Sequence, residues 1–385
     1  MGVYLDAAAT TPVDPDVYRV IQPYFCDTYG NPSSLHSVGR IARRAVEKAR
    51  EQVAECLGCD SSQVFFTSGA TEADNWAIQM QHRYLENSGF DWYAILYSDI
   101  EHKAILNSIN KEDFVITVDK SGIVDLQKIK NLAGNIHAKF CVCVMWINNE
   151  VGSIQPIKEL SDFCYEHKIP LHVDATQAVG KVAISLKDYP GITTLAFSGH
   201  KIHSCKGAGA LFVRDPEADY VRPFIHGGGQ EHGLRAGTEN VPAIVGLGAA
   251  MEKIANKNFD NTQVYDCHKH LLSALSEIEC VRFNGEGDHH SPYYLSVSFK
   301  GIEGEALQLS LDRHGIAVSA GSACNSGSLE PSHVLKAMGV PEDSINGTIR
   351  ITFSDTNTLD ECEYVAKTIK EEVAKLRSIS PNWKG

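Results

Sequence analysis

The sequence predicts an α/β protein whose larger part is a doubly wound, mostly parallel sheet. Through roughly the first 255 of its 385 residues, short apolar runs that resemble strands alternate with helical patterns. This alternation is typical of parallel α/β sheets, which bind ligands beyond the carboxyl ends of their strands. Polar residues follow several predicted strands at those ends. From about residue 265 the order changes to mixed helices and strands, which predicts a smaller α+β domain.

The length of the chain supports two domains, because 385 residues exceed what one hydrophobic core usually organises. We expect a large domain over residues 15–255 and a small α+β domain made of residues 1–14 and 256–385. The composition, 43% hydrophobic and 22% charged, is that of an ordinary globular protein with enough apolar material for both cores.

Charge and segment composition exclude several classes of protein. The net charge is −13 and no basic run occurs, so we expect no direct binding of nucleic acid. The N-terminus lacks the regions of a signal peptide, and no apolar run approaches membrane-spanning length, so we expect a cytoplasmic protein without a membrane partner. Eleven cysteines then predict reduced thiols. Cys56 and Cys59 lack the further ligands of a closed zinc site, and we expect no metal.

The first predicted elements lead to a turn that suits an anion. We expect a short strand and a small-residue turn over residues 6–12, and then a helix that starts at Asp14 and Pro15. Apolar residues recur at helical spacing over residues 37–57. The strand over residues 64–67 ends in a glycine turn that opens the next helix. Free N–H groups and the helix dipole make that turn a candidate anion site.

The alternation continues to the stretch that carries the most chemistry. Strands are predicted over residues 93–97, 140–146, 170–174, 194–197 and 210–213, and helices from residue 101 and over 157–167. The run at 140–146 is apolar on both faces, as expected of a central parallel strand. Ser198-Gly199-His200-Lys201 separates the last two strands. A lysine at a strand end, beside a histidine and a serine, suits a Schiff base to an aldehyde cofactor.

The second domain has a different pattern. Strands are predicted over residues 295–299, 316–319 and 348–353, with a helix ending near residue 311 and a last helix over 360–376. In the first domain, successive strand–helix units supply polar residues at the strand ends: Thr71, His102, Asn149, Asp174, Gln177, Ser198, His200 and Lys201. Because successive units supply this set, we expect one site at the sheet edge.

Four motifs occur in order: Asp174-x-x-Gln177, the Lys201 stretch, a Gly-rich segment at 227–231, and Arg235-Ala236-Gly237-Thr238. With them the chain resembles the class V aminotransferase family, which are pyridoxal-phosphate enzymes of fold type I. The segment Gly321-Ser322-Ala323-Cys324, with Ser-Leu-Glu-Pro-Ser at 328–332, narrows the resemblance to cysteine desulfurases of the IscS/NifS type. This resemblance implies a large domain with a mostly parallel seven-stranded sheet.

The resemblance implies roles around the cofactor pyridoxal 5'-phosphate. Lys201 would hold it as a Schiff base and carry the α-proton of the substrate. Asp174 would pair with the pyridine nitrogen, Gln177 would hydrogen-bond the phenolic oxygen, and His102 would stack on the ring as a catalytic residue. The phosphate ligands would be backbone N–H groups near Ala70, the side chains of Thr71, Ser198 and His200, and Thr238 of a second chain. The chain would therefore form a homodimer.

The resemblance also implies the substrate. Arg350 would hold the carboxylate of L-cysteine as a bidentate fork, and Asn149 would assist beside the substrate and the cofactor. The Cys324 thiolate would attack the substrate's sulfur, which leaves a persulfide on Cys324 and releases L-alanine. Sulfur would pass to acceptor proteins for iron–sulfur cluster assembly, tRNA thiolation or DNA phosphorothioation. The family usually has Gly-Pro where this chain has Ser204 and Cys205, and we interpret Cys205 as incidental.

Two alternative functions stay open at the level of sequence. A selenocysteine lyase, or another class V pyridoxal-phosphate enzyme, would share the Lys201 site. A catalytically silent scaffold would only bind sulfur-handling partners. Alanine release by the wild type and Cys324→Ala distinguishes the persulfide mechanism from the first alternative. Cofactor absorbance, and its response to borohydride in Lys201→Ala, distinguishes it from the scaffold.

Overall fold

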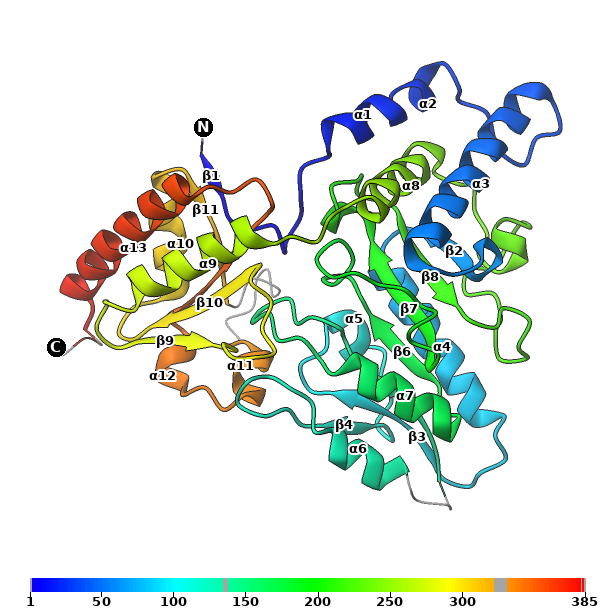
Figure 1. Cartoon of the computed structure of the whole chain (residues 1–385). Coiled ribbons are helices and arrows are strands. Elements are labelled where there is room, and N and C mark those ends of the chain that lie inside the picture. Colours follow the sequence, from blue (N-terminus) through cyan, green and yellow to red (C-terminus); the bar gives the residue numbers. More distant parts are fainter. Residues whose placement is uncertain (1, 134–137, 322–330, 382, 384–385) are drawn as a thin grey trace.

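The largest element of the fold is a seven-stranded sheet in the order β2-β8-β7-β6-β5-β3-β4 (Figure 1). The computed structural model describes residues 2–133, 138–321, 331–381 and 383. The strands of the sheet are β2 (Val64–Thr67), β3 (Tyr93–Ser98), β4 (Phe114–Ile116), β5 (Lys139–Cys143), β6 (Leu171–Asp174), β7 (Ile192–Ser198) and β8 (Gly209–Val213). Neighbours from β7 to β4 pair in parallel, and only β8 runs antiparallel to its neighbours β7 and β2. The predicted α/β class and mostly parallel seven-stranded sheet are confirmed.

Helices cover both faces of this sheet because its strands send alternate side chains to opposite sides. The helices around it are α3 (Ser37–Leu57), α4 (Ala70–Glu86), α5 (Lys103–Leu106), α6 (Leu126–Ala133), α7 (Ile157–His167) and α8 (Val241–Ala255). On β2, Phe65 packs with Trp76 of α4. Its neighbours Val64 and Phe66 belong to the cluster that includes buried residues of α3, α7 and α8. A sheet covered on both faces leaves its strand ends as the place for a site.

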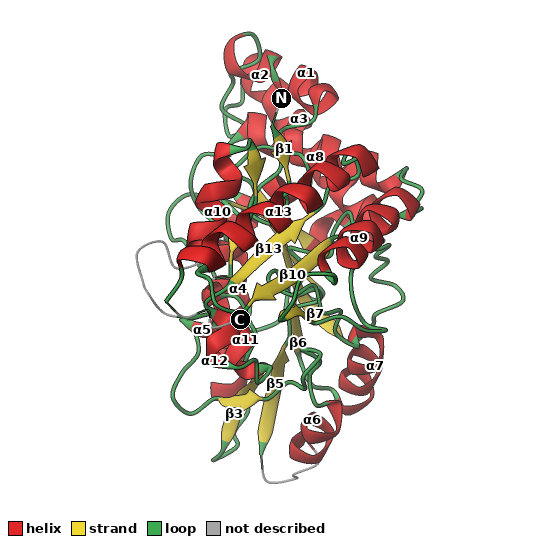
Figure 2. Cartoon of the chain, turned by 90° about the vertical axis from the view of Figure 1, so that its left-hand side faces the viewer, coloured by secondary structure: helices red, strands yellow, loops and turns green. Residues whose placement is uncertain are grey.

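A second, smaller group of elements lies beside the sheet, on the left in Figure 1 and facing the viewer in Figure 2. It contains β9 (Val281–Asn284), β10 (Tyr294–Phe299), β12 (Ser319–Ala320), β13 (Thr348–Thr352), α9 (Thr262–Leu275), α10 (Gly304–Arg313) and α13 (Leu359–Ile379). The four strands form an antiparallel sheet in the order β12-β13-β10-β9. Helices α9 and α10 contact this sheet, and α13 packs against both.

The N-terminal residues join this smaller group. Strand β1 (Val3–Tyr4) pairs in parallel with β11 (Ile316–Ala317). The chain then crosses to α1 (Pro15–Ile21) and α2 (Pro23–Cys26), which lie over α8 (Figure 1). The smaller group is α+β, as predicted, while the domain boundaries at residues 14/15 and 255/256 stay predictions. The remaining short elements are α11 (His333–Ala337), α12 (Glu342–Ile345), η1 (Ser61–Gln63), η2 (Gly199–Lys201) and η3 (Glu231–Gly233).

Among the described residues, no helix combines the length and the apolar character needed to cross a membrane. The cysteines of this part of the chain are free thiols. Cys56 and Cys59 lie at the C-terminal end of α3, where burial raises the pKa of each thiol to about 12.

Several predicted boundaries are wrong, each for a local reason. Residues 6–12 form no strand, because the backbone turns after β1 and Asp6 makes only an isolated bridge to Thr352. The helix expected from residue 101 is the single turn α5, which His102 caps. The strand expected over 140–146 ends at Cys143, although the N–H groups of Val144 and Trp146 still donate to carbonyls of β6. The run at 316–319 divides into β11 and β12, and the sequence prediction missed β4 and β9.

Candidate active site

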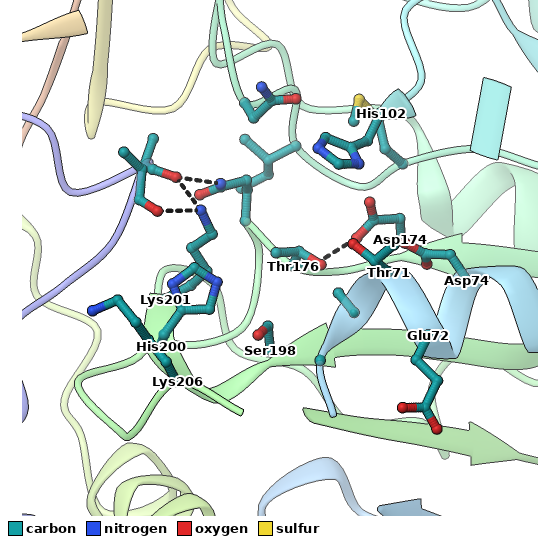
Figure 3. Close-up of a pocket in the computed structure, with 18 of the residues that line it drawn as sticks. Thr71, Glu72, Asp74, His102, Asp174, Thr176, Ser198, His200, Lys201 and Lys206 are labelled. Carbon is teal, nitrogen blue, oxygen red and sulfur yellow. Dashed lines mark hydrogen bonds between the residues drawn. The ribbon is translucent and has the colours of Figure 1, made fainter. Parts of the chain in front are cut away.

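A cavity of about 540 Å³ lies beyond the carboxyl ends of the parallel strands (Figure 3). Ten of the residues predicted from the sequence line it: Ala70, Thr71, His102, Asn149, Asp174, Gln177, Ser198, His200, Lys201 and Arg350. Thr238 is exposed and does not line this cavity. Cys324 lies outside the described residues. The cavity therefore brings together ten of the twelve predicted residues, nine from the edge of the large sheet and Arg350 from β13.

Lys201 lies where the sequence expects it, just after β7, in the short turn η2. Its Nζ donates hydrogen bonds to the backbone carbonyls of Ala8 and Ala9, at 2.5 and 2.7 Å. The segment before α1 is bonded to the same turn, since Thr11 N–H donates to the carbonyl of His200 at 2.9 Å. The small residues after β1 thus form one wall of the cavity and hold the lysine amine inside it.

His200 is neutral at physiological pH. Burial lowers the pKa of His200 to about 4, and the nearby charges of Lys201 and Lys206 act in the same direction. Its Nδ1 lies 3.2 Å from the Thr10 hydroxyl. A neutral ring beside an anion can still donate one N–H, and Lys206 adds positive charge from the cavity wall.

Asp174 and Gln177 form the floor of the cavity. The Thr176 N–H donates to Oδ1 of Asp174 at 2.9 Å, which holds the carboxylate at the end of β6 (Figure 3). Gln177 donates from Nε2 to the Ala8 carbonyl at 3.1 Å, and its Oε1 accepts from the Tyr294 hydroxyl at 2.5 Å. The amide of Gln177 is therefore fixed from two sides, by the N-terminal segment and by β10.

A buried polar layer lies beneath this floor. The ring of His172 on β6 contacts the Thr194 hydroxyl at 2.9 Å and Oδ1 of Asp74 at 3.2 Å. Burial lowers the pKa of His172 to about 3, and it raises the pKa of Asp74 well above its usual range. Burial also raises the pKa of Glu101 to about 8, although Ser98 and the Met145 N–H donate to its Oε1. Burial therefore disfavours the charged forms of His172, Asp74 and Glu101 in this layer.

One end of the cavity is built for an anion. The N-terminus of α4, a helix of 17 residues, opens here at Ala70 and Thr71, and Ser198 lies opposite. A Cβ at position 69 would lie 3.6 Å from the Ser198 hydroxyl, in ordinary van der Waals contact, so Ser198 lies close to the turn that opens α4. Gly209 permits the turn to approach the sheet, because a Cβ there would lie 2.7 Å from the Cα of Gly69.

Glu72 holds the turn at Ser68 and Gly69, which forms the anion-binding end of the cavity. Its Oε2 accepts the N–H of Ser68 at 2.9 Å. Arg235 donates to both carboxylate oxygens, from Nε at 2.8 Å and from Nη2 at 3.1 Å. This bidentate pair joins the anion-binding turn to the segment that contains Thr238, three residues further along the chain.

His102 lies across the cavity from Lys201 in Figure 3, near Asp174. Its Nδ1 accepts the N–H of Ala104 at 3.1 Å and so caps α5. Burial lowers the pKa of His102; the charge of Lys201 adds to this effect and Asp174 opposes it. The ring is held in place by the cap, and its face remains available to a flat ligand.

Arg350 on β13 lines the cavity from the smaller group of elements. Its Nη1 donates to the Asn149 carbonyl at 3.0 Å, and its Nη2 donates to Asp6 Oδ1 at 2.9 Å and to the Ser319 hydroxyl at 3.1 Å. Its buried Nε has no hydrogen-bond partner. The guanidinium is thus oriented in advance, with one donor unpaired.

Sequence reasoning missed several residues of this site. Thr176 lines the cavity with a buried hydroxyl that has no hydrogen-bond partner, and Ser319 and Tyr294 orient Arg350 and Gln177. Thr176 lies within the Asp174-x-x-Gln177 spacing, which was a sufficient signal to include it. No sequence signal joins Ser319 or Tyr294 to the site, because both come from the distant smaller group.

Comparisons with known proteins agree with this geometry. Residues 3–365 match the family model "Aminotransferase class-V". The chain is 40% identical to cysteine desulfurase IscS of Methanosarcina thermophila over 99% of this chain and 94% of that one. A solved NifS-like protein superposes with a TM-score of 0.88 at 37% identity, covering 98% of this chain and all of that chain. A structure of SspA in complex with cysteine superposes with a TM-score of 0.78 at 35% identity, covering 91% of this chain and 98% of that one. The chain belongs to the class V aminotransferase family and, within it, to the cysteine desulfurases of the IscS/NifS type, a pyridoxal-phosphate-dependent group.

Proposed function

We propose that this cysteine desulfurase binds pyridoxal 5'-phosphate through Lys201, converts L-cysteine to L-alanine and collects the sulfur as a persulfide on Cys324. The observation that carries the proposal is the convergence of an amine, a carboxylate, an anion-binding helix end and a buried arginine on one cavity. Each corresponds to one part of the cofactor–substrate pair. The structural likeness to SspA in complex with cysteine supports the choice of substrate.

The residues present fit this cofactor. The N-terminus of α4 and the Ser198 hydroxyl, which meet at one end of the cavity, suit a phosphate. The unpaired buried hydroxyl of Thr176 and the carboxylate of Asp174 suit the polar edge of a pyridinium ring. A buried polar atom without a protein partner costs free energy unless a ligand satisfies it. These observations support a site built around a bound polar molecule.

The cofactor ligands follow from these positions. Asp174 would hold the protonated ring nitrogen, Gln177 the phenolic oxygen, and His102 one face of the ring. The phosphate would lie against the Ala70 N–H, Thr71, Ser198 and His200. When bound, the cofactor supplies an electron sink that stabilises negative charge at the substrate's Cα. Lys201 would hold the cofactor and then, as a free amine, carry the α-proton.

Arg350 would bind the substrate carboxylate through its unpaired Nε and through Nη2, with Asn149 beside it. The Arg350 guanidinium is already desolvated, with 7% of its side chain exposed, so its charge acts on a carboxylate with little screening by water. The carboxylate would share Nη2 with Asp6, whose Oδ1 accepts from it now.

Cys324 would complete the reaction. Its thiolate attacks the sulfur of the substrate, the C–S bond breaks, and the electron pair of that bond stays on carbon and takes up a proton. The products are L-alanine and Cys324 persulfide, so no oxidant or reductant is consumed. We infer that an acceptor protein then takes the sulfur for iron–sulfur cluster assembly, tRNA thiolation or DNA phosphorothioation.

The proposal also covers the oligomeric state, the domain division and the location of the protein in the cell. Thr238 is exposed in the single chain and belongs to a segment that Glu72 holds beside the anion site. This position supports a homodimer in which Thr238 reaches the partner's phosphate. The proposal keeps the domain division into residues 15–255 and residues 1–14 with 256–385, and a cytoplasmic location.

Alanine release tests the proposed reaction. The wild type, Cys324→Ala and Cys205→Ala are incubated with L-cysteine and a thiol reductant, and alanine and protein persulfide are quantified. Wild type and Cys205→Ala should release alanine at similar rates, and Cys324→Ala should fall by two orders of magnitude or more, because covalent catalysis splits a step that is otherwise slow. Unimpaired alanine release by Cys324→Ala would contradict the persulfide mechanism.

A further inference from the structure

Two histidines and a glutamate meet away from the active-site cavity, in the smaller group of elements. His268 lies on α9, and Glu286 and His290 lie in the connection between β9 and β10. One nitrogen of each histidine and one oxygen of the carboxylate all lie within 4.8 Å of one another. The His268 and His290 rings lie side by side, with centroids 5.2 Å apart. The three residues come from two separate parts of the chain, so their convergence is a property of the fold.

His290 has the features of a metal ligand. Its side chain is 5% exposed, and its Nε2 has no hydrogen-bond partner. The backbone at Val151 also interacts with this ring. A buried imidazole nitrogen without a hydrogen-bond partner can offer its lone pair to a metal ion when the other ring nitrogen carries the proton.

The spacing of the atoms fits an ion. Oε1 of Glu286 lies 3.1 Å from Nε2 of His268 and 3.6 Å from Nε2 of His290. Ligand atoms about 2.1 Å from a tetrahedral ion lie roughly 3.4 Å apart. The hydrogen bond to Glu286 satisfies His268, but Nε2 of His290 lies beyond hydrogen-bonding distance of the same oxygen and is buried without a hydrogen bond, which destabilises the cluster unless a ligand binds there.

We propose that His268, Glu286 and His290 bind a divalent first-row transition-metal ion, with zinc the best match. Two imidazoles and one carboxylate form a mixed nitrogen–oxygen set that suits zinc, and three protein ligands leave a fourth position for water. Glu286 is 26% exposed, so the ion reaches the site from solvent on that side. The sequence reasoning that expected no metal looked for ligands close together in the chain, and His268 and Glu286 are 18 residues apart.

The position of the site suggests a structural purpose. The backbone of His290 bridges to Ser153, and the N–H of Ser291 donates to the Gly152 carbonyl at 2.9 Å. A side chain at position 152 would place its Cβ 3.1 Å from Nε2 of His290, so this glycine keeps the ligand atom uncrowded. The same loop carries Asn149, which lines the cavity. A bound ion would join α9 to the β9–β10 connection, which is itself bonded to this loop behind the active site.

The test is metal binding by the metal-stripped holoenzyme. Zn²⁺ is measured by equilibrium dialysis with elemental analysis, and Co²⁺ by its d–d absorption. We expect one ion per chain, a Co²⁺ spectrum without a thiolate charge-transfer band, and a higher melting temperature with Zn²⁺. His290→Ala, His268→Gln and Glu286→Gln should each weaken Zn²⁺ binding at least about tenfold, since loss of even an outer partner costs 10–100-fold. His289→Ala, an exposed neighbour, is the matched control and should bind as the wild type does.

Circular dichroism of each variant separates loss of the site from loss of the fold. If His290→Ala fails to fold, Glu286→Gln, which keeps the shape of the side chain, supplies the same comparison. The proposal is overturned if the wild type binds no stoichiometric ion, if the folded ligand variants bind Zn²⁺ as tightly as His289→Ala does, or if the Co²⁺ spectrum shows thiolate ligation.

Discussion

Arg350 donates a hydrogen bond of 2.9 Å to Asp6, a residue that precedes it by 344 positions. The pair joins β13 to the turn after β1, and the same turn supplies the carbonyls of Ala8 and Ala9 that hold the Lys201 amine. Because the guanidinium is 7% exposed, this carboxylate compensates its charge before any substrate arrives. The N-terminal segment thus orients both the proposed substrate-binding arginine and the proposed cofactor lysine.

Replacing Arg350 by lysine should raise the KM for L-cysteine by about 10- to 100-fold. Lysine keeps the charge but loses the planar fork, and a hydrogen bond to a charged group contributes about 1.5–3 kcal/mol. Steady-state alanine release measures the effect, and Arg313→Lys, at the exposed end of α10, serves as the control. An unchanged KM in Arg350→Lys would show that the carboxylate binds elsewhere.

Replacing Glu72 by glutamine should weaken binding of pyridoxal phosphate by about tenfold, without contact between Glu72 and the cofactor. The substitution removes the charge that holds Arg235 and loosens the Ser68–Gly69 turn, which presents the helix N-terminus. Titration of the apoenzyme, followed by cofactor absorbance, gives the affinity. Glu86→Gln at the exposed end of α4 should leave the affinity for pyridoxal phosphate unchanged. Equal affinities in the two variants would show that Glu72 does not support the cofactor site.

Mixed dimers test the role of Thr238. Homodimers of Lys201→Ala should be inactive, and Thr238→Val should bind the cofactor about 10- to 100-fold more weakly. If Thr238 serves the partner's site, a dimer of one Lys201→Ala chain and one Thr238→Val chain contains one intact site. At limiting cofactor it should then reach about half the wild-type rate. Activity no higher than that of the Thr238→Val homodimer would place Thr238 in its own chain's site or in none.

Glu101 should make the protein less stable as pH rises from about 4.5 to 8. Burial raises its pKa to about 8, so the folded chain keeps a proton that the unfolded chain releases near 4.5. The stabilisation is complete below the unfolded pKa and is lost as pH approaches the folded one, by at most about 1.4 kcal/mol per pH unit. Urea unfolding of Glu101→Gln should show a shallower slope, since Asp74 still contributes one of the same sign, whereas exposed Glu112→Gln should keep the full slope. Parallel profiles for Glu101→Gln and the wild type would contradict the assignment.

Local sequence signals predicted much of the fold. The strand over 64–67 and the helix over 37–57 have the observed bounds, because an apolar run or a 3.6-residue period decides them within a single element. Over residues 6–12 the predicted small-residue turn is present, but the short strand before it was wrong because Asp6 and the following residues make side-chain and carbonyl contacts in place of a ladder. Such contacts depend on β13 and on the turn at Lys201, which lie far along the chain.

The candidate site shows the same difference between local signals, which the sequence reveals, and contacts between distant segments, which it does not. Nine predicted residues reached one cavity because parallel strands bring their carboxyl ends to one edge, and Arg350 of β13 reaches it from the smaller group of elements. Pairs that join distant segments, such as Glu72 with Arg235, gave no signal in the sequence, since their spacing of 163 residues matches no periodicity. The His268 cluster was missed for the same reason.

Reductive trapping tests the central claim most directly. The holoenzyme is treated with borohydride, digested, and mapped by mass spectrometry for a phosphopyridoxyl lysine. The account predicts the adduct on Lys201, which lies inside the cavity between His200 and the Ala8 carbonyl, and none in Lys201→Ala. An adduct on Lys206, or one that persists unchanged in Lys201→Ala, would contradict it.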